Sequence, residues 1–311
     1  MMNTETALAL MRSPGSNPRR LRAVMNWARL AKSELEPLLG LREPEIVDAL
    51  PPALADAARM IAACSESLRE RSAREWERAG RAGVTALRYG DTDYPAHVQD
   101  TLQSDAPPIL FVAGSLDLLR EPGLGIVGAR RCSAAGVDRS RSCARFAARL
   151  GASVVSGGAP GIDEAAHEEA LHGRGSTVLV LPQGILRFRA SSACMEAVES
   201  GAAALVSAAP PSEGFTTASA LSRNALVCAH SRVVCVIGPK DTGGSIHAAR
   251  RALAQHRPLF VWCEEAHRDV QDRLEREGAQ PLVDEAGGVR TAALEEAWAA
   301  AHTLPRQPDL L

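Results

Sequence analysis

The sequence has few aromatic residues and no cysteines at the spacing of a metal site. Phe, Trp and Tyr make up 4% of its 311 residues, which argues against a protein that binds unpaired bases mainly by stacking. The seven cysteines are odd in number, scattered and never spaced as CxxC. This usage is typical of reduced thiols in the cytoplasm and argues against a disulfide framework or a zinc site.

Long apolar runs are also missing. The longest, residues 177–181 and 233–237, are far shorter than the roughly 20 residues of a membrane-spanning helix. The N-terminal segment does not have the layout of a cleavable signal. We therefore expect a cytoplasmic protein without a membrane partner. With 46% hydrophobic and 23% charged residues, the composition is that of a globular protein, and the length suggests two domains.

The charges are unevenly distributed, although the net charge is only −2. Residues 128–190 contain nine arginines and five acids, a net +4. Residues 215–260 contain five arginines and Lys240 against Asp241, a net +5, whereas residues 261–311 contain five arginines against eleven acids, a net −6. A basic centre beside an acidic end indicates a polyanionic ligand.

The order of the expected elements predicts the fold class. Residues 1–20 are polar and read as a flexible N-terminus, and residues 21–83 have helical periodicity broken by prolines, which predicts a small all-helical domain. From residue 84 to 285, strand-like runs alternate with helical patterns. This alternation predicts an α/β, extended Rossmann-like core with a mostly parallel sheet and helices on both faces. Residues 286–311 are expected to form a short acidic tail or helix, too short for a winged-helix domain.

The expected strands and helices define one edge of the sheet as the place for a ligand. Expected strands cover residues 109–112, 124–127, 154–156, 177–181, 205–207, 232–237 and 258–262. Expected helices cover residues 135–150, 163–172, 195–200, 219–230 and 245–255. In such sheets, ligands bind beyond the carboxyl ends of the strands, so the loops at those ends are the candidates.

Two glycine-containing loops follow the first parallel strands. In residues 125–130 (GIVGAR), Gly128 lets the chain turn, and the following amides can meet a phosphate at a helix N-terminus. In residues 154–163 (VVSGGAPGID), the small residues from Ser156 to Gly161 can expose consecutive N–H groups to an anion. Either segment also fits an ordinary turn between a strand and a helix.

Three later loops add cations and amides to the same edge. Arg187 and Arg189 flank Phe188 after the strand at 177–181, and Arg223 and Asn224 lie early in the helix expected at 219–230. Residues 238–245 (GPKDTGGS) repeat the glycine-rich pattern before another helix. The candidate DNA- or phosphate-binding residues are therefore Gly128, Arg130, Ser156, Gly157, Gly158, Gly161, Arg187, Arg189, Arg223, Asn224, Lys240, Gly243, Gly244 and Ser245.

Asp163 and His167 stand four residues apart, on one helix face. They could form a catalytic pair or bind a metal, but the sequence suggests no third ligand nearby. We favour the interpretation that Asp163 caps the helix and His167 packs or hydrogen-bonds locally. No GxSxG, P-loop or HExxH motif occurs. We therefore expect no catalytic residue, no metal and no cofactor.

In their order and spacing, these motifs resemble the DNA-processing protein A family (DprA, also called Smf). The resemblance runs from about residue 76 to 282. Besides the loops above, it includes Tyr94-Pro95, residues 107–114 (PPILFVAG), 258–261 (PLFV) and 276–279 (REGA). It implies an extended Rossmann fold, often behind a small helical domain. It also implies a non-catalytic role in natural transformation (competence) and DNA recombination: binding and protecting single-stranded DNA, forming a dimer, and helping to load the recombinase RecA.

Site residues follow from the same resemblance. Arg130 would contact phosphate, residues 156–161 would cradle phosphate, and Arg223-Asn224 match the Arg-Asn pair of the family. Lys240 with residues 243–245 matches its second glycine loop. The sequence departs from the family pattern at Ala225, where a second arginine is common, and in the loop after residue 181, which lacks Tyr-Pro.

Two other functions stay open from the sequence. Relatives of this fold bind or cleave nucleotides, so a nucleotide-binding or nucleotide-hydrolysing (phosphoribohydrolase-like) sensor is the alternative. Those enzymes have a PGGxGTxxE-type loop, whereas residues 243–247 (GGSIH) lack its Thr and Glu. A scaffold whose glycine loops serve only as turns is the third reading.

Overall fold

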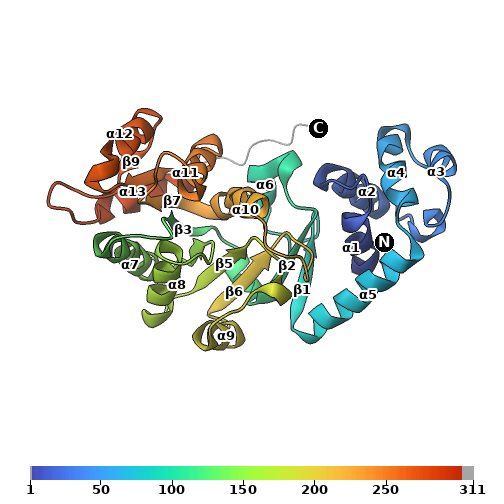
Figure 1. Ribbon diagram of the computed structural model, residues 1–311, viewed down its shortest axis with the longest axis horizontal. Helices are drawn as coiled ribbons and strands as arrows, with labels where there is room; N and C mark the ends of the chain where they lie inside the picture. The colour runs from blue at the N-terminus through green and yellow to red at the C-terminus, as the bar shows by residue number, and fades with distance from the viewer. Residues whose placement is uncertain (1, 303–311) are drawn as a thin grey trace.

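The computed structural model describes residues 2–302, so the end of the predicted acidic tail, residues 303–311, lies outside the described residues. The predicted α/β fold class is confirmed: a sheet with helices on both faces follows an all-helical N-terminal region (Figure 1). No helix within residues 2–302 combines the length and the apolar character needed to cross a membrane.

Helices build the N-terminal region, and the three longest of them start at a polar cap. Asn3, Asn17 and Ser65 accept hydrogen bonds from backbone amides in the first turns of α1, α2 and α5, which satisfies amides that a helix start leaves unpaired. The elements are α1 (Thr4–Arg12), α2 (Pro18–Leu30), η1 (Glu36–Leu38), α3 (Glu43–Ala49), η2 (Pro52–Ala57), α4 (Ala58–Ala62) and α5 (Glu66–Arg81).

The N-terminus differs from the sequence-based expectation of a flexible segment over residues 1–20. Within it, helix α1 has four consecutive residues, Ala7 to Leu10, with no solvent exposure. The helix packs against α5, and its apolar side chains belong to the core of the helical region. This short apolar run therefore stabilises the segment as a helix. The free energy gained by burying its side chains exceeds the cost of ordering the polar residues around it.

Within the described residues, nine strands form one sheet in the order β1-β2-β6-β5-β4-β3-β7-β8-β9. The strands from β6 to β9 in this order are parallel, whereas β1 pairs antiparallel with β2 and β2 with β6. Their bounds are β1 (Val84–Arg88), β2 (Ile109–Gly114), β3 (Gly123–Gly128), β4 (Val154–Ser156), β5 (Thr177–Leu181), β6 (Ala203–Ser207), β7 (Ser231–Ile237), β8 (Leu259–Trp262) and β9 (Gln280–Pro281).

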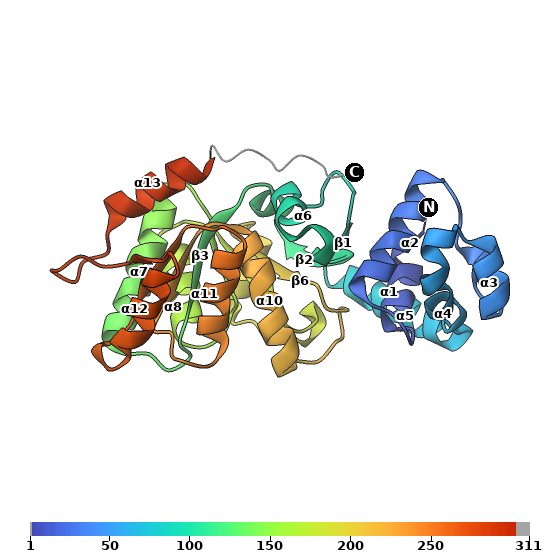
Figure 2. The same ribbon diagram turned by 90° about the horizontal axis from the view of Figure 1, so that it is seen from above.

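Alternating side chains of the central strands pack on opposite helix layers. In β7, Cys235 and Ile237 join the core with α7 and α8, whereas Val234 and Val236 join the core with α11. Both layers are visible in Figures 1 and 2. The remaining elements are α6 (Ala96–Leu102), η3 (Gln103–Asp105), η4 (Leu116–Leu119), α7 (Ala134–Arg149), α8 (Ile162–His172), η5 (Ile185–Arg187), α9 (Ser192–Glu199), α10 (Thr217–Ala229), α11 (Gly244–Ala254), η6 (Glu265–His267), α12 (Arg268–Arg276) and α13 (Thr291–His302).

The helical region is attached to the sheet through a shared core. Helix α5 leads into β1, and the cluster that fills the helical region also contains Phe111 of β2 and Leu181 of β5. The rings of Trp76 on α5 and Phe111 lie 6.3 Å apart, a separation typical of interacting aromatic rings. The helical region therefore packs beside the β1–β2 end of the sheet (Figure 2).

Strand β3 lies at the point where the direction of winding reverses. Through α7 the chain passes from β3 to β4 on one side, whereas α10 leads into β7 on the other side. Gly128, the last residue of β3, pairs with Ile237, the last residue of β7. The crevice beyond the carboxyl ends of such strands is where ligands of doubly wound sheets bind.

Candidate nucleic-acid interface

A cleft of about 500 Å³ opens at this reversal point. It is bounded by the loops that follow β3, β4 and β7 and by the first turns of α10. The structure thus brings together most of the cationic and glycine residues predicted for the edge. Those that line the cleft are Gly128, Arg130, Arg223, Asn224, Lys240, Gly243, Gly244 and Ser245.

Asp163 holds two of these loops together. Its Oδ1 accepts the Gly128 amide at 3.2 Å, and its Oδ2 accepts the amides of Gly157 at 3.2 Å and Ala159 at 3.4 Å. The side chain therefore does not cap α8, in contrast to the interpretation we favoured. The amides of Gly157 and Ala159 have this internal acceptor instead of facing an anion.

Gly161 allows the second loop to lie against the first. Its φ is +89°, and a Cβ there would lie 2.6 Å from the carbonyl oxygens of Ala129 and Arg130. A side chain would meet both a rare backbone conformation and two backbone atoms. Glycine at this position therefore sets the distance between the two loops.

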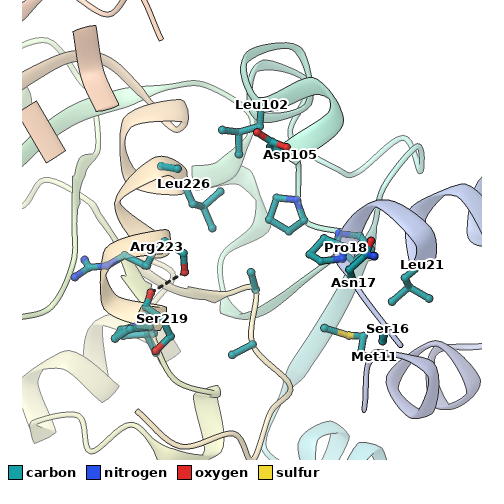
Figure 3. Close-up of a pocket in the computed structure, with 18 residues that line it drawn as sticks. Met11, Ser16, Asn17, Pro18, Leu21, Leu102, Asp105, Ser219, Arg223 and Leu226 are labelled. Atoms are coloured by element: carbon teal, nitrogen blue, oxygen red, sulfur yellow. Dashed lines mark hydrogen bonds between the residues drawn. The ribbon is translucent and has the colours of Figure 1, made fainter. Parts of the chain in front are cut away.

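Arg223 forms part of the floor of the cleft. Its guanidinium packs on Gly157, where a Cβ would lie 1.3 Å from Nη1. Figure 3 shows that the guanidinium points away from a neighbouring groove of about 380 Å³ that contains Pro18 and Leu21. Within the described residues, its Nε and Nη1 are buried and have no hydrogen-bond partner.

The electrostatics around Arg223 favour an anion. Burial lowers the pKa of Arg223, and the carboxylate of Asp163 opposes that shift. Burial also raises the pKa of Asp163, which Arg223 and the three amides oppose. Arg130 adds a second positive charge nearby. Two guanidinium nitrogens of Arg223 have no hydrogen-bond partner among the described residues, whereas buried donors are normally paired.

The loop after β7 presents an open helix start. Gly243 has a φ of +109° and precedes α11 without a side-chain cap, so the first amides of the helix are available to an anion. The predicted residue Asn224 supports this loop, because its Nδ2 donates to the Gly244 carbonyl at 2.9 Å. Lys240 and Gly243 are exposed.

Several predicted residues lie outside the cleft lining. Ser156 is fully buried, and its hydroxyl donates to the Ile126 carbonyl inside the sheet. Gly157, Gly158 and Gly161 form the loop behind the lining. Arg187 and Arg189 are exposed in the segment after β5, where Arg187 Nε donates to the Ser212 carbonyl at 3.2 Å.

His167 has a local role. Its Nδ1 lies 2.6 Å from Thr177 Oγ1, and burial lowers its pKa to about 3. Because Asp163 and His167 have separate partners, they do not act as a pair. Within residues 2–302, no group of three or more His, Cys, Asp or Glu side chains could hold a metal ion.

The lining also contains residues that sequence reasoning missed, among them Arg131, Phe215 and Thr217. Arg131 directly follows the predicted Arg130, which was an available signal. Phe215 is 52% exposed and stands between small and polar residues, so no periodicity identifies it.

The cleft lies within the part of the chain that matches a known family. The family model described as DNA recombination-mediator protein A matches residues 85–293. DNA processing protein DprA of Streptococcus pneumoniae is 33% identical over 161 residues, which are 50% of this chain and 56% of that protein. Protein Smf of Escherichia coli is 33% identical over 171 residues, 54% of this chain and 45% of that protein. The chain thus spans about half the length of these curated relatives.

Solved structures show the same fold. The X-ray structure of DNA processing protein A from Streptococcus pneumoniae has a TM-score of 0.70 at 24% identity, covering 92% of this chain and 97% of that one. DNA processing protein A from Helicobacter pylori, solved to describe its single-stranded DNA binding mode, has a TM-score of 0.56 at 28% identity, covering 68% and 96%. Since the family model covers well over half of the chain and every loop around the cleft, the chain belongs to the DNA recombination-mediator protein A family.

Proposed function

We propose that this protein binds single-stranded DNA in the cleft at the β3–β7 reversal point and protects it during natural transformation and recombination. The observation that carries the proposal is the guanidinium of Arg223, buried at the cleft floor with two nitrogens unpartnered within the described residues. The single-stranded DNA binding described for the Helicobacter pylori relative supports the choice of ligand.

The charges around the cleft suit a phosphate chain. Arg130, Arg223 and Lys240 come from three different elements and converge on one lining, next to the open start of α11. The one carboxylate among the described lining residues, Asp163, accepts three backbone amides. Contacts to phosphates position a strand without reading its sequence, and the single aromatic residue of the lining, Phe215, offers little base recognition.

The proposal includes the protein partners that the resemblance implies. RecA and a second copy of this chain are the proposed partners, in the cytoplasm. The protein performs no enzymatic step in this proposal. One observation supports this part of the proposal. Asp163 and His167 came closest to a catalytic pair in the sequence, and each of them makes structural hydrogen bonds.

Substituting the cleft arginines should weaken DNA binding. We expect Arg223→Ala and Arg130→Ala each to bind oligo-dT about tenfold more weakly, with little dependence on base sequence, because each removes a phosphate contact. The slope of log affinity against log salt should become shallower by about 0.7 per lost contact. Fluorescence anisotropy over a salt series measures both effects.

Arg120→Ala is the matched control, because Arg120 is an exposed arginine outside the cleft, paired with Asp117. If both cleft variants kept the affinity of the wild type, the site assignment would be wrong. A protein that bound common nucleotides with a weak salt dependence, and oligo-dT not at all, would instead be the nucleotide sensor.

Gly157→Ala tests the position of the Arg223 guanidinium. The added methyl would overlap Nη1, and the flexible side chain, not the backbone, would move. We expect the variant to unfold within about 1 kcal/mol of the wild type but to bind oligo-dT as weakly as Arg223→Ala. Urea unfolding and anisotropy measure the two results, and wild-type affinity would show that the packed position of Arg223 is unimportant.

A further inference from the structure

A second basic hollow lies between helix α5 and the segment that connects β6 to α10. It has a volume of about 620 Å³ and is bounded by four arginines. Arg71, Arg74 and Arg78 are three and four residues apart on α5, so they lie along one face of the helix, and all three are exposed. The lining consists of Arg12, Leu68, Arg71, Arg74, Glu75, Arg78 and Ser212.

The acids near this hollow neutralise Arg12 more than the α5 arginines. Glu75 is buried and accepts from Arg12 at 3.0 Å and from the Ser212 amide at 2.6 Å. Glu213 lies 3.7 Å from the same Arg12 guanidinium. The positive charge of Arg12 is therefore balanced inside the fold.

The positive charges of Arg71, Arg74 and Arg78 on α5 are balanced much less by nearby acids. Arg78 Nη2 donates to the Ser212 hydroxyl at 2.8 Å, and Arg71 Nε donates to the Ser67 carbonyl at 3.3 Å, both neutral groups. Arg74 pairs with Glu70 at 3.7 Å, but both side chains are more than half exposed. Exposed pairs of this kind are weak and exchange readily for another anion.

A short segment joins this hollow to the cleft. Ser212 lines the hollow and Phe215 lines the cleft. Three residues span at most about 11 Å of extended chain, a distance that a stacked strand covers with about three nucleotides. Arg187 donates to the carbonyl of the same Ser212, which adds a further cation beside this segment.

We propose that Arg71, Arg74 and Arg78, here called the α5 stripe, form a second contact surface for single-stranded DNA. This inference rests on the proposed function, because the strand that reaches the stripe is the one that leaves the cleft past Phe215. The guanidinium groups contact phosphates and read no bases. The stripe therefore lengthens the binding site, and its contribution depends on the length of the DNA.

The test compares oligo-dT of two lengths on the full chain. A short oligonucleotide of about six nucleotides fills only the cleft, whereas one of about 20 reaches the stripe. The triple variant Arg71→Gln, Arg74→Gln, Arg78→Gln should bind the long one about tenfold more weakly and lower its salt slope by about 2, since three phosphate contacts are lost. Its affinity for the short one should equal that of the wild type.

The matched control is the triple variant Arg42→Gln, Arg120→Gln, Arg268→Gln. These arginines are exposed, pair with carboxylates and line neither hollow, so the control has the same change in net charge. It should bind both lengths like the wild type. Thermal unfolding of both triple variants shows whether they are folded.

The outcomes separate the two claims. If Arg223→Ala weakens binding but the stripe variant matches the control at both lengths, the stripe is not a contact surface and the cleft stands. If the stripe variant loses equal affinity for both lengths, the length dependence is refuted as well. If the wild type binds neither oligonucleotide, the proposed function itself fails.

Discussion

Replacing Asp163 by alanine should lower the free energy of unfolding by about 4 kcal/mol. The carboxylate is 3% exposed and accepts the amides of Gly128, Gly157 and Ala159. Its removal leaves these amides without an acceptor, at about 1–3 kcal/mol for each that stays buried. It also leaves the nearby, partly buried guanidinium of Arg223 without the negative charge that offsets its desolvation. This loss is large compared with the free energy of unfolding of a typical protein, about 5–15 kcal/mol. Urea unfolding measures it.

Asp241→Ala provides the comparison, because Asp241 lies on the same edge but is exposed and pairs with Arg273 at 2.7 Å. Loss of such a surface pair should cost less than about 1 kcal/mol. Adding Arg223→Met to Asp163→Ala should restore part of the lost stability, since the uncompensated charge is then gone. Equal effects of Asp163→Ala and Asp241→Ala would contradict the structural role of Asp163.

Acidification from pH 7 to pH 5 should destabilise the protein by about 4 kcal/mol through its buried histidines. Burial lowers the pKa of His167 to about 3 and that of His230 to about 4. Their stabilising contribution is complete above the unfolded value near 6.5. This contribution is lost as the pH falls from 6.5 toward the pKa values of the folded state, because in this range only the unfolded chain takes up protons at these histidines. Each histidine contributes about 2 kcal/mol over this interval.

The histidine contribution can be isolated by substitution. His167→Gln retains a partner for Thr177 but cannot be protonated. Between pH 6 and pH 5, the free energy of unfolding of this variant should therefore depend less steeply on pH than that of the wild type, by the equivalent of up to one bound proton. His256→Gln serves as control, because His256 is exposed. His230 also faces His97, with Nδ1 and Nε2 2.5 Å apart, so the pair counts here as one titrating unit. An unchanged slope for His167→Gln would rule out the assignment.

The central sheet could be predicted because buried strands are continuously apolar. The strands at 154–156 and 177–181 have the predicted bounds, and the five helices expected between the strands of the core begin within three residues of prediction. The strands at the edges of the sheet were harder to predict. Strand β1 is five residues long with only two of them buried, and β9 has only two residues, so neither has a continuous apolar run. Helix α12 has few apolar residues among its charges and was not predicted.

For the candidate site, the sequence located the loops but not the contacts within them. A parallel sheet places all strand ends of one direction on one edge, and this rule alone brings Gly128 and Ser245 together. It does not predict that Asp163 occupies the loop amides or that Ser156 points into the sheet. Nor does it predict that Arg223 crosses from α10 to rest on Gly157, since that approach joins residues far apart in the chain.

The core shared by Trp76 and Phe111 has a consequence for any ligand long enough to touch both halves of the molecule. This shared core holds both binding surfaces in one rigid unit at a fixed spacing. A DNA strand bound at one surface can then bind the other without the loss of conformational entropy that a flexible linker between the two surfaces would cause. Loosening that aromatic contact should therefore reduce avidity for long strands even if every arginine is left in place.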